Sequence, residues 1–350
     1  MSDTPQKWLE RSRPPRVQIT YDVETGGAIE KKELPFIIAV LADLSGLRDA
    51  SAEVTPLKAR EVIALDRDNF AAVMAQYQPQ ESVRRGLAHL VMHLETSAML
   101  QIKVLDLTQK ELSDDFEKSV SFDQSTLFKR LYESTYGTYG GLPFSLIVGD
   151  YEIGSGAADM AFLTKMSAIA AAVHAPFIAS APTTVFGLPN WQNFRKPEDS
   201  RYVTLIQSSA YELATLIGLA FASSHWPVSF AYDDCEHASE NTGISVRLPY
   251  LLAASRFAHY LKVIMREKIG SFLTRANIES YLNSWISQYV LLDDNATEAA
   301  KAAFPLRAAN IVVTEIAGRV GSYQATMFIK PHFQLQELTT SMRLVVSLPG

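Results

Sequence analysis

The clearest strand pattern in the chain is Thr339-Thr-Ser-Met-Arg-Leu-Val-Val-Ser-Leu-Pro349. Two sets of side chains alternate along it: Met342, Leu344, Val346 and Leu348 fall on one face, and Ser341, Arg343, Val345 and Ser347 on the other. Because successive side chains of a β-strand point to opposite faces, this alternation predicts a half-buried strand.

A matching pattern lies near the other end of the chain, where Val17, Ile19, Tyr21 and Val23 alternate with polar residues. A terminal strand presents an edge of backbone N–H and C=O groups that need partners. The two predicted strands therefore either pair with each other or pair with strands of another molecule.

Composition excludes several classes of protein. The chain has 350 residues, 47% of them hydrophobic and 20% charged, as in a soluble globular protein large enough for two subdomains. A net charge of -6 argues against nucleic-acid binding, which needs a basic face. The single cysteine, Cys235, excludes an internal disulfide and suits a reducing cytoplasm. Residues 1–16 are polar, unlike a secretory signal.

Two long runs without charged residues, 166–194 and 213–232, raise the question of a membrane span. Pro176, Pro182 and Pro189 interrupt the first run, and Pro227 with its polar neighbours interrupts the second. A spanning helix needs roughly 20 continuous apolar residues. We therefore expect buried core elements here and no membrane insertion.

Periodicity predicts an α/β fold of mixed α+β type, with layers of sheet and helices and with terminal strands available for exchange between subunits. The predicted strands are 17–23, 36–41, 62–65, 102–107, 144–148, 176–180, 227–232, 310–316, 322–330 and the closing strand 342–348. The predicted helices are 70–77, 80–94, 113–116, 124–132, 157–173, 200–222, 249–269, 277–290 and a short one before Pro305.

Three local signals set boundaries within this pattern. Pro249 stands where a proline at the first helical position is favoured. Asn295 and Glu298 have the spacing of a capping box. Residues 149–152, Gly-Asp-Tyr-Glu, have the composition of a turn.

Two groups of residues have the side chains of a metal site. His89 and His93 lie four residues apart on one helical face, a spacing that can hold zinc. Leu90 stands where the metalloprotease pattern has its general base, so we interpret the pair as surface histidines. Residues 233–237, Asp-Asp-Cys-Glu-His, cannot all converge on one ion, which favours a solvated acidic loop.

A catalytic or cofactor site has little support. Gly154-Ser-Gly156 follows a predicted strand as a dinucleotide loop would, but Asp159 occupies the third glycine position and repels a pyrophosphate. The loop 136–141, Tyr-Gly-Thr-Tyr-Gly-Gly, either packs on a partner or covers its own chain. We predict no catalytic residue, no cofactor and no metal.

The first eighty residues resemble the small subunit (TssB, also called VipA) of the type VI secretion contractile sheath. The matching stretches are 6–21, 33–36, 40–46 and 65–74. From Glu81 onward the chain resembles the large subunit (TssC, also called VipB), with matching stretches at 127–152, 171–181, 248–270 and 331–350. The resemblance implies three segments: 1–80 like the small subunit, 81–306 as the large-subunit α/β core, and 307–350 as C-terminal strands.

The chain departs from both subunits. The small-subunit likeness stops near Pro79, and a long internal stretch of the large subunit is missing between about Val203 and Arg247. The large-subunit likeness also starts inside that protein, after the segment that in the family carries a pairing strand and the site recognised by a recycling AAA+ unfoldase. This puts the unfoldase in doubt as a partner. The chain thus resembles a compressed fusion of both subunits.

The resemblance implies a structural role in the bacterial cytoplasm. In this family, subunits form hexameric rings stacked around an inner tube, and contraction propels the tube. Neighbours exchange terminal strands, which here correspond to residues 17–23 and 322–348. The implied partners are other sheath subunits, the inner-tube protein and the baseplate. Two alternatives remain: a regulator that binds sheath components without polymerising, and a nucleotide-dependent α/β enzyme using the Gly154 loop.

Overall fold

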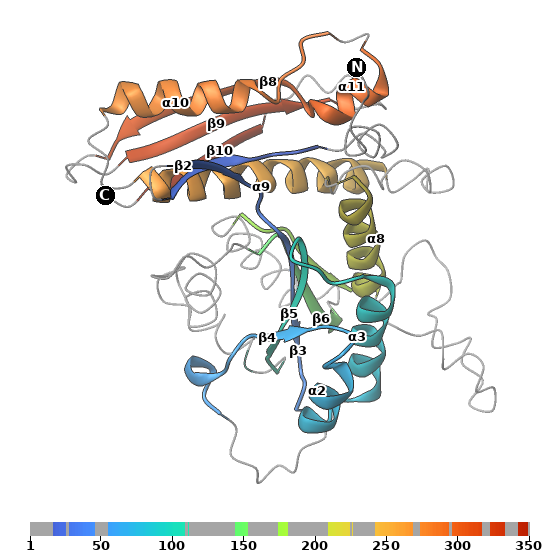
Figure 1. The fold of residues 1–350 in the computed structure, drawn as a ribbon. Helices are drawn as coiled ribbons and strands as arrows, with labels where there is room; N and C mark the ends of the chain where they lie inside the picture. Colours follow the sequence, from blue (N-terminus) through green and yellow to red (C-terminus); the bar gives the residue numbers. More distant parts are fainter. Residues whose placement is uncertain are drawn as a thin grey trace, which may run out of the picture. The chain divides into compact units, whose positions relative to one another are not determined.

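A computed structural model describes much of the chain. It covers residues 17–25, 28–45, 55–108, 111, 144–152, 174–180, 209–224, 226, 242–268, 274–293, 296–316, 323–332 and 342–348. Helices and sheets are mixed, which confirms the predicted α/β class (Figure 1). Contacts divide the chain into two compact units: Pro35–Leu219, here the parallel-sheet unit, and Met1–Leu34 with Ala220–Gly350, here the terminal unit.

The parallel-sheet unit contains a five-stranded sheet of order β4-β5-β3-β6-β7. Its strands are β3 (Phe36–Ala42), β4 (Ile63–Leu65), β5 (Leu100–Asp106), β6 (Leu146–Glu152) and β7 (Phe177–Ser180). All neighbours are parallel except β4, which runs antiparallel to β5. Every residue of β3 is buried, as expected of a continuous apolar run at the centre of a parallel sheet, and the strand predicted at 36–41 is confirmed.

Helices α2 (Phe70–Tyr77), α3 (Glu81–His93) and α8 (Ser209–Ser224) accompany this sheet. The helix predicted at 80–94 is confirmed, and its apolar residues Leu87, Leu90, Val91 and Leu94, at helical spacing, are all buried. Gly86 permits close contact with α8, since a Cβ atom there would lie 2.3 Å from the ring of Tyr211. The glycine is thus required by packing between helices.

A buried polar network ties together the carboxyl ends of β3 and β5. The carboxylate of Asp106 accepts hydrogen bonds from the Leu44 N–H and the Ser45 hydroxyl. Arg60, which follows the 3₁₀ helix η1 (Leu57–Ala59), donates to the Asp106 carbonyl and makes a two-pronged pair with Glu111. These side chains therefore satisfy backbone groups at the carboxyl ends of β3 and β5.

The terminal unit combines an antiparallel sheet with helices and a hairpin. Its sheet has the order β10-β9-β8, formed by β8 (Leu306–Glu315), β9 (Tyr323–Pro331) and β10 (Met342–Leu348). Its helices are α9 (Thr242–Lys268), α10 (Arg275–Ser287) and α11 (Glu298–Ala303). The hairpin consists of β1 (Tyr21–Thr25) and β2 (Ala28–Lys32), which pair only with each other among the described strands.

Four side chains hold the backbone at the two ends of this hairpin. Two come from α9, one from α10, and one from Tyr289, just after α10. Before β1, the Thr20 N–H donates to the Tyr289 hydroxyl at 3.0 Å, and the Thr20 carbonyl accepts from the Trp285 indole N–H at 2.9 Å. After β2, the Leu34 N–H donates to the Tyr260 hydroxyl at 2.7 Å, and the Leu34 carbonyl accepts from Arg256. We call these four contacts the hairpin clamp.

Aromatic packing makes the hairpin clamp rigid. Phe257 contacts the rings of Trp285 and Tyr289 with centroids 6.1 and 5.7 Å apart. The guanidinium of Arg256 is buried and lies 5.1 Å from the ring centroids of both Phe221 and Tyr260, as in cation–π pairs. Burial lowers the pKa of Arg256. The clamp therefore belongs to the core of the terminal unit.

Several predicted boundaries are wrong. Residues 149–152 continue β6, where a register shift against β7 replaces the predicted turn. Pro249 lies inside α9, which begins at Thr242. The helix continues through it, although proline removes one N–H donor and crowds the carbonyl of the preceding turn. Thr297 caps α11, because its hydroxyl oxygen accepts a hydrogen bond from the Ala300 N–H. The predicted capping box, with Asn295 as the cap, is therefore wrong.

Other boundaries shift by a few residues. The first strand starts at Tyr21 instead of Val17, and α10 starts at Arg275, two residues earlier than predicted, with Thr274 as its cap. Strand β2 was not predicted. The expected elements at 113–116, 124–132, 157–173 and 227–232 lie outside the described residues.

We expect Glu111→Gln to lower the free energy of unfolding by about 1–3 kcal/mol at neutral pH, because buried Arg60 loses its anionic partner. Burial raises the pKa of the Glu111 carboxyl, but hydrogen bonds from Arg60 and Thr108 outweigh it and hold the pKa below its usual 4.5. Such a carboxyl stabilises the fold above its ordinary pKa and loses this contribution as the pH falls through the lower folded value.

Urea denaturation of both proteins between neutral and acid pH measures this linkage. The difference in the free energy of unfolding between wild type and variant should have its full size above pH 4.5 and become smaller below it. Glu81→Gln is the control, because its pairs with Arg84 and Arg85 are exposed and should matter less. A gap that does not change with pH would contradict the role assigned to the ion pair.

We expect Tyr289→Phe to loosen the hairpin at its base, because the variant keeps the packed ring but removes the partner of the Thr20 N–H. The free energy of unfolding should fall by about 1–2 kcal/mol. Hydrogen exchange at the Thr20 amide should become faster. Tyr323→Phe, in β9, controls for loss of a tyrosine hydroxyl in the same unit. Unchanged exchange at Thr20 would show that the hydroxyl does not hold the hairpin.

Candidate functional site

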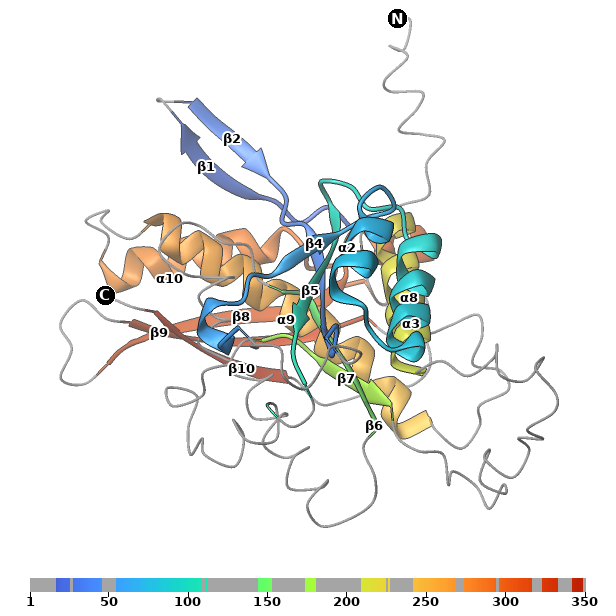
Figure 2. The ribbon, with the colours of Figure 1, turned by 90° about the horizontal axis from the view of Figure 1, so that it is seen from below.

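The hairpin exposes one of its two strands entirely. All five residues of β2 are exposed, and the apolar residue Ile29 is 74% exposed. Figure 2 shows β1 and β2 extending away from α10 and the sheet of their own unit. A two-stranded hairpin is marginally stable by itself, so an anchored but exposed one is suited to pairing with a further strand. We call residues 21–32 the arm.

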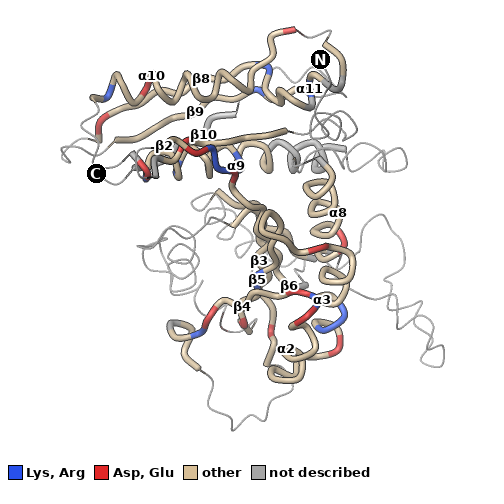
Figure 3. Tube along the Cα trace, in the orientation of Figure 1, with Lys and Arg blue, Asp and Glu red and all other residues tan. Residues whose placement is uncertain are grey.

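The arm carries charges of both signs. Glu30, Lys31 and Lys32 follow each other on β2 (Figure 3). Asp22 on β1 lies opposite Lys31 in the register, and opposite charges at such positions favour the pairing. Charges on an edge strand also discourage nonspecific association. These charges therefore support the pairing of β1 with β2 and make nonspecific association of the exposed strand less favourable.

The predicted exchange residues of the N-terminal segment fall into two groups. Val17, Ile19 and Tyr21 are buried in the terminal unit, and Val23 on β1 is half-buried. The predicted alternation is present, because Gln18 and Asp22 between them are exposed. Residues 17–20 are, however, not part of a described strand. The exposed strand of this region is β2, which has no such alternation.

The predicted exchange residues of the C-terminal segment, Met342, Leu344, Val346 and Leu348, all lie on β10. Among the described strands β10 pairs only with β9, so it forms one edge of the three-stranded sheet. It does not share a sheet with β1. The two terminal patterns therefore occupy separate sheets in one copy of the chain, and neither β10 nor β1 has a second strand partner among the described strands.

The register identifies the backbone groups at the outer edge of β10. On β8, the N–H and C=O of Ile311 and Val313 point away from β9, because they bond to α10. Opposed residues of antiparallel strands alternate between bonded and non-bonded pairs. We follow this alternation from β8 through β9 to β10 with the two registers. The backbone groups of residues 342, 344 and 346 then point toward β9, and those of 343, 345 and 347 point outward.

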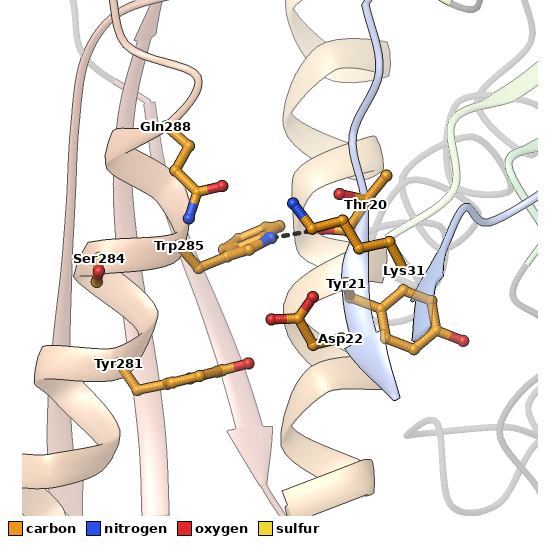
Figure 4. Close-up of a pocket in the computed structure, with 8 residues that line it drawn as sticks. All are labelled: Thr20, Tyr21, Asp22, Lys31, Tyr281, Ser284, Trp285 and Gln288. Carbon is orange, nitrogen blue, oxygen red and sulfur yellow. Dashed lines mark hydrogen bonds between the residues drawn. The ribbon is translucent and has the colours of Figure 1, made fainter. Parts of the chain in front are cut away.

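A small open cavity of about 220 Å³ lies between the arm and α10 (Figure 4). Figure 4 shows the bond from the Trp285 indole to Thr20 at its side. Burial and the charge of Asp22 raise the pKa of Tyr281 in its wall. Its remaining lining residues are Tyr21, Lys31, Ser284 and Gln288. The cavity lies at the base of the arm, where the arm and α10 separate.

The other predicted sites are described only in part. His89 and His93 stack with centroids 4.2 Å apart, and His93 Nδ1 lies 2.8 Å from the His89 carbonyl. Burial and the neighbouring His93 lower the pKa of His89. No group of three possible metal ligands occurs among the described residues. Residues 136–141, 233–237 and the Gly154 loop lie outside them.

The described part of the chain holds no helix that is long and apolar enough to cross a membrane.

Three family models match the chain. The model described as "EvpB/VC_A0108, tail sheath N-terminal domain" matches residues 68–204, and "EvpB/VC_A0108, tail sheath gpW/gp25-like domain" matches residues 237–348. The model described as "Type VI secretion system, VipA, VC_A0107 or Hcp2" matches residues 9–112. Together they place a small-subunit match before two large-subunit matches, in the predicted order.

Two relatives from Pseudomonas aeruginosa show the same division. Type VI secretion system sheath protein TssC1 is 31% identical over 407 residues, covering 79% of this chain and 82% of the relative. That alignment is longer than this 350-residue chain, so part of the relative has no counterpart here. Sheath protein TssB1 is 43% identical over 75 residues, which are 21% of this chain and 42% of that relative. The chain therefore belongs to the type VI secretion system sheath proteins, as a structural subunit that joins a TssB-like segment to a TssC-like segment.

Proposed function

We propose that copies of this chain polymerise into the sheath by strand addition, with the arm of one copy pairing along the outer edge of β10 in the next. The observation that carries this proposal is the unpaired edge of β10 among the described strands. The exposed arm supplies a strand for that edge without unfolding any other element. Main-chain hydrogen bonds give such a joint its strength, and alternate side chains fix its register.

The proposal assigns different tasks to the residues of the two terminal segments. Val17 and Ile19 anchor the arm in its own copy, where they are buried. Tyr21 and Val23 begin the arm, and β2 lies beside them. Met342, Leu344, Val346 and Leu348 hold β10 to β9, and the backbone of residues 343, 345 and 347 receives the incoming strand. The exchange thus joins a two-stranded arm to a three-stranded sheet.

The direction of the joint determines the shape of the assembly. An arm that pairs with the next copy and a sheet that receives an arm from the previous copy are different surfaces, so the contact is head-to-tail. Head-to-tail contacts that do not close produce a helical filament. Contraction then requires a second packing of the same subunits, reached by rigid-body rotation about the strand joints.

The proposal also includes the cellular location of the subunit, its lack of catalytic activity and its partners. The subunit works in the bacterial cytoplasm without catalysing a reaction, and its partners are other sheath subunits, the inner-tube protein and the baseplate. Recycling by an AAA+ unfoldase is left out of the proposal, because the family resemblance puts that partner in doubt. A regulator that binds sheath subunits without polymerising is the competing function, and the segments of TssC1 without a counterpart here favour it.

Two neighbouring proline variants test the joint. Val345→Pro removes an outward N–H and leaves the ladder to β9 intact, and proline is tolerated at such edge positions. We expect the variant to fold but not to form tubes or ring stacks. Val346→Pro removes a bond to β9 and should instead destabilise the sheet itself. Circular dichroism checks folding, and negative-stain microscopy with sedimentation checks assembly.

The outcomes separate the two functions. If Val345→Pro assembles as well as wild type, β10 does not receive the strand and the proposed joint is wrong. If wild-type protein stays monomeric and blocks the growth of sheaths made by other subunits, the chain is the regulator. Tubes from wild type and monomers from Val345→Pro support the sheath joint.

A further inference from the structure

The second edge of the three-stranded sheet, along β8, is occupied in a different way. Helix α10 runs beside β8 (Figure 1). Three polar residues of α10, four positions apart, face the outward backbone groups of β8, and they are Arg275, Glu279 and Asn283. We call them the α10 stripe.

Asn283 replaces a peptide group of a missing strand. Its amide Nδ2 donates to the Ile311 carbonyl at 2.6 Å, and its Oδ1 accepts from the Ile311 N–H at 2.9 Å. A neighbouring antiparallel strand would offer the same donor and acceptor to this residue. The side-chain amide therefore satisfies both backbone groups of one outward-facing position.

Glu279 and Arg275 do the same for the next outward position. The Val313 N–H donates to the Glu279 carboxylate at 2.8 Å, and the Val313 carbonyl accepts from Arg275 at 3.1 Å. The two charged groups lie 3.9 Å apart, so each also balances the charge of the other. Four backbone groups of β8 thus find partners on a helix.

Helical spacing makes this arrangement possible. Four residues of an α-helix rise by about 6 Å, while two residues of an antiparallel strand span about 6.8 Å. One side chain per helical turn therefore matches one outward residue of the strand. The chain after α10 continues the coverage, because the Leu306 N–H donates to the Tyr289 carbonyl and its C=O accepts from the Leu291 N–H.

We propose that the α10 stripe closes the edge of β8 against strand addition, so that a second copy of the chain joins this sheet only at β10. The inference rests on the proposed function for the acceptor role of β10, but the closure of β8 stands on its own contacts. An open edge at β8 would give each subunit a second acceptor, and pairing there would branch or misdirect the filament. The stripe is thus a specificity element for assembly.

Asn283→Leu opens the edge at Ile311 with a side chain of similar size. Asn277→Leu, on an exposed position of the same helix, is the matched control. Both changes are made together with Val345→Pro, so that β10 is blocked. The probe is a synthetic, fluorescent peptide with the sequence of residues 17–33, and binding is measured by sedimentation and titration calorimetry.

We expect the Asn283→Leu protein to bind one peptide per chain, while Val345→Pro alone and the Asn277→Leu control bind none. Hydrogen exchange at the Ile311 amide should become at least tenfold faster in Asn283→Leu and stay unchanged in the control. Absence of peptide binding by Asn283→Leu, or unchanged exchange at Ile311, would overturn the closure of β8.

The same peptide separates this inference from the proposed joint. With the native residue at position 345, a chain that accepts strands at β10 binds one peptide, and the Asn283→Leu variant binds two. If the native chain binds none while Asn283→Leu binds one, the closure stands and the β10 joint is wrong. Glu279→Ala, which exposes the Val313 N–H instead, repeats the test if Asn283→Leu fails to fold.

Discussion

Backbone groups at the edge of a sheet must find hydrogen-bond partners, and the terminal unit meets this constraint in three ways. On β8, a helix supplies side-chain amide, carboxylate and guanidinium groups to Ile311 and Val313. At the ends of the hairpin, four side chains take the N–H and C=O of Thr20 and Leu34. The edge of β10 has no strand partner among the described strands, and in the proposed joint it receives a strand from another molecule.

The hairpin clamp bonds to the backbone at both ends of the arm and to no side chain of β2. Its contacts to Thr20 and Leu34 go to the backbone, and both residues lie outside the paired strands. The side chains of β2 are therefore free to be charged and exposed. A buried arginine and three aromatic residues at the base provide the rigidity that a two-stranded hairpin lacks on its own.

Predictions from the sequence succeeded where burial follows a period. The run that became β3, the stripe of α3 and the alternation of Val17 and Ile19 all reflect side chains that must avoid water. Strand β2 was missed because all its residues are exposed, so its sequence shows no alternation and only pairing with β1 makes it a strand. Motif resemblance, rather than periodicity, carried the assignment to the sheath family, which the TssC1 alignment confirms.

The α10 stripe could not have been predicted for a related reason. Polar residues at i, i+4 and i+8 are typical of the solvent-facing side of a helix. What distinguishes Arg275, Glu279 and Asn283 is the strand beside them, whose outward groups repeat at nearly the helical spacing. The pattern gains its meaning only once β8 and α10 are known to be neighbours. An edge that is closed by side chains, rather than by a strand, can keep its polar groups satisfied while offering no further edge to a neighbour. Under the proposed joint, such a closure restricts strand addition to β10.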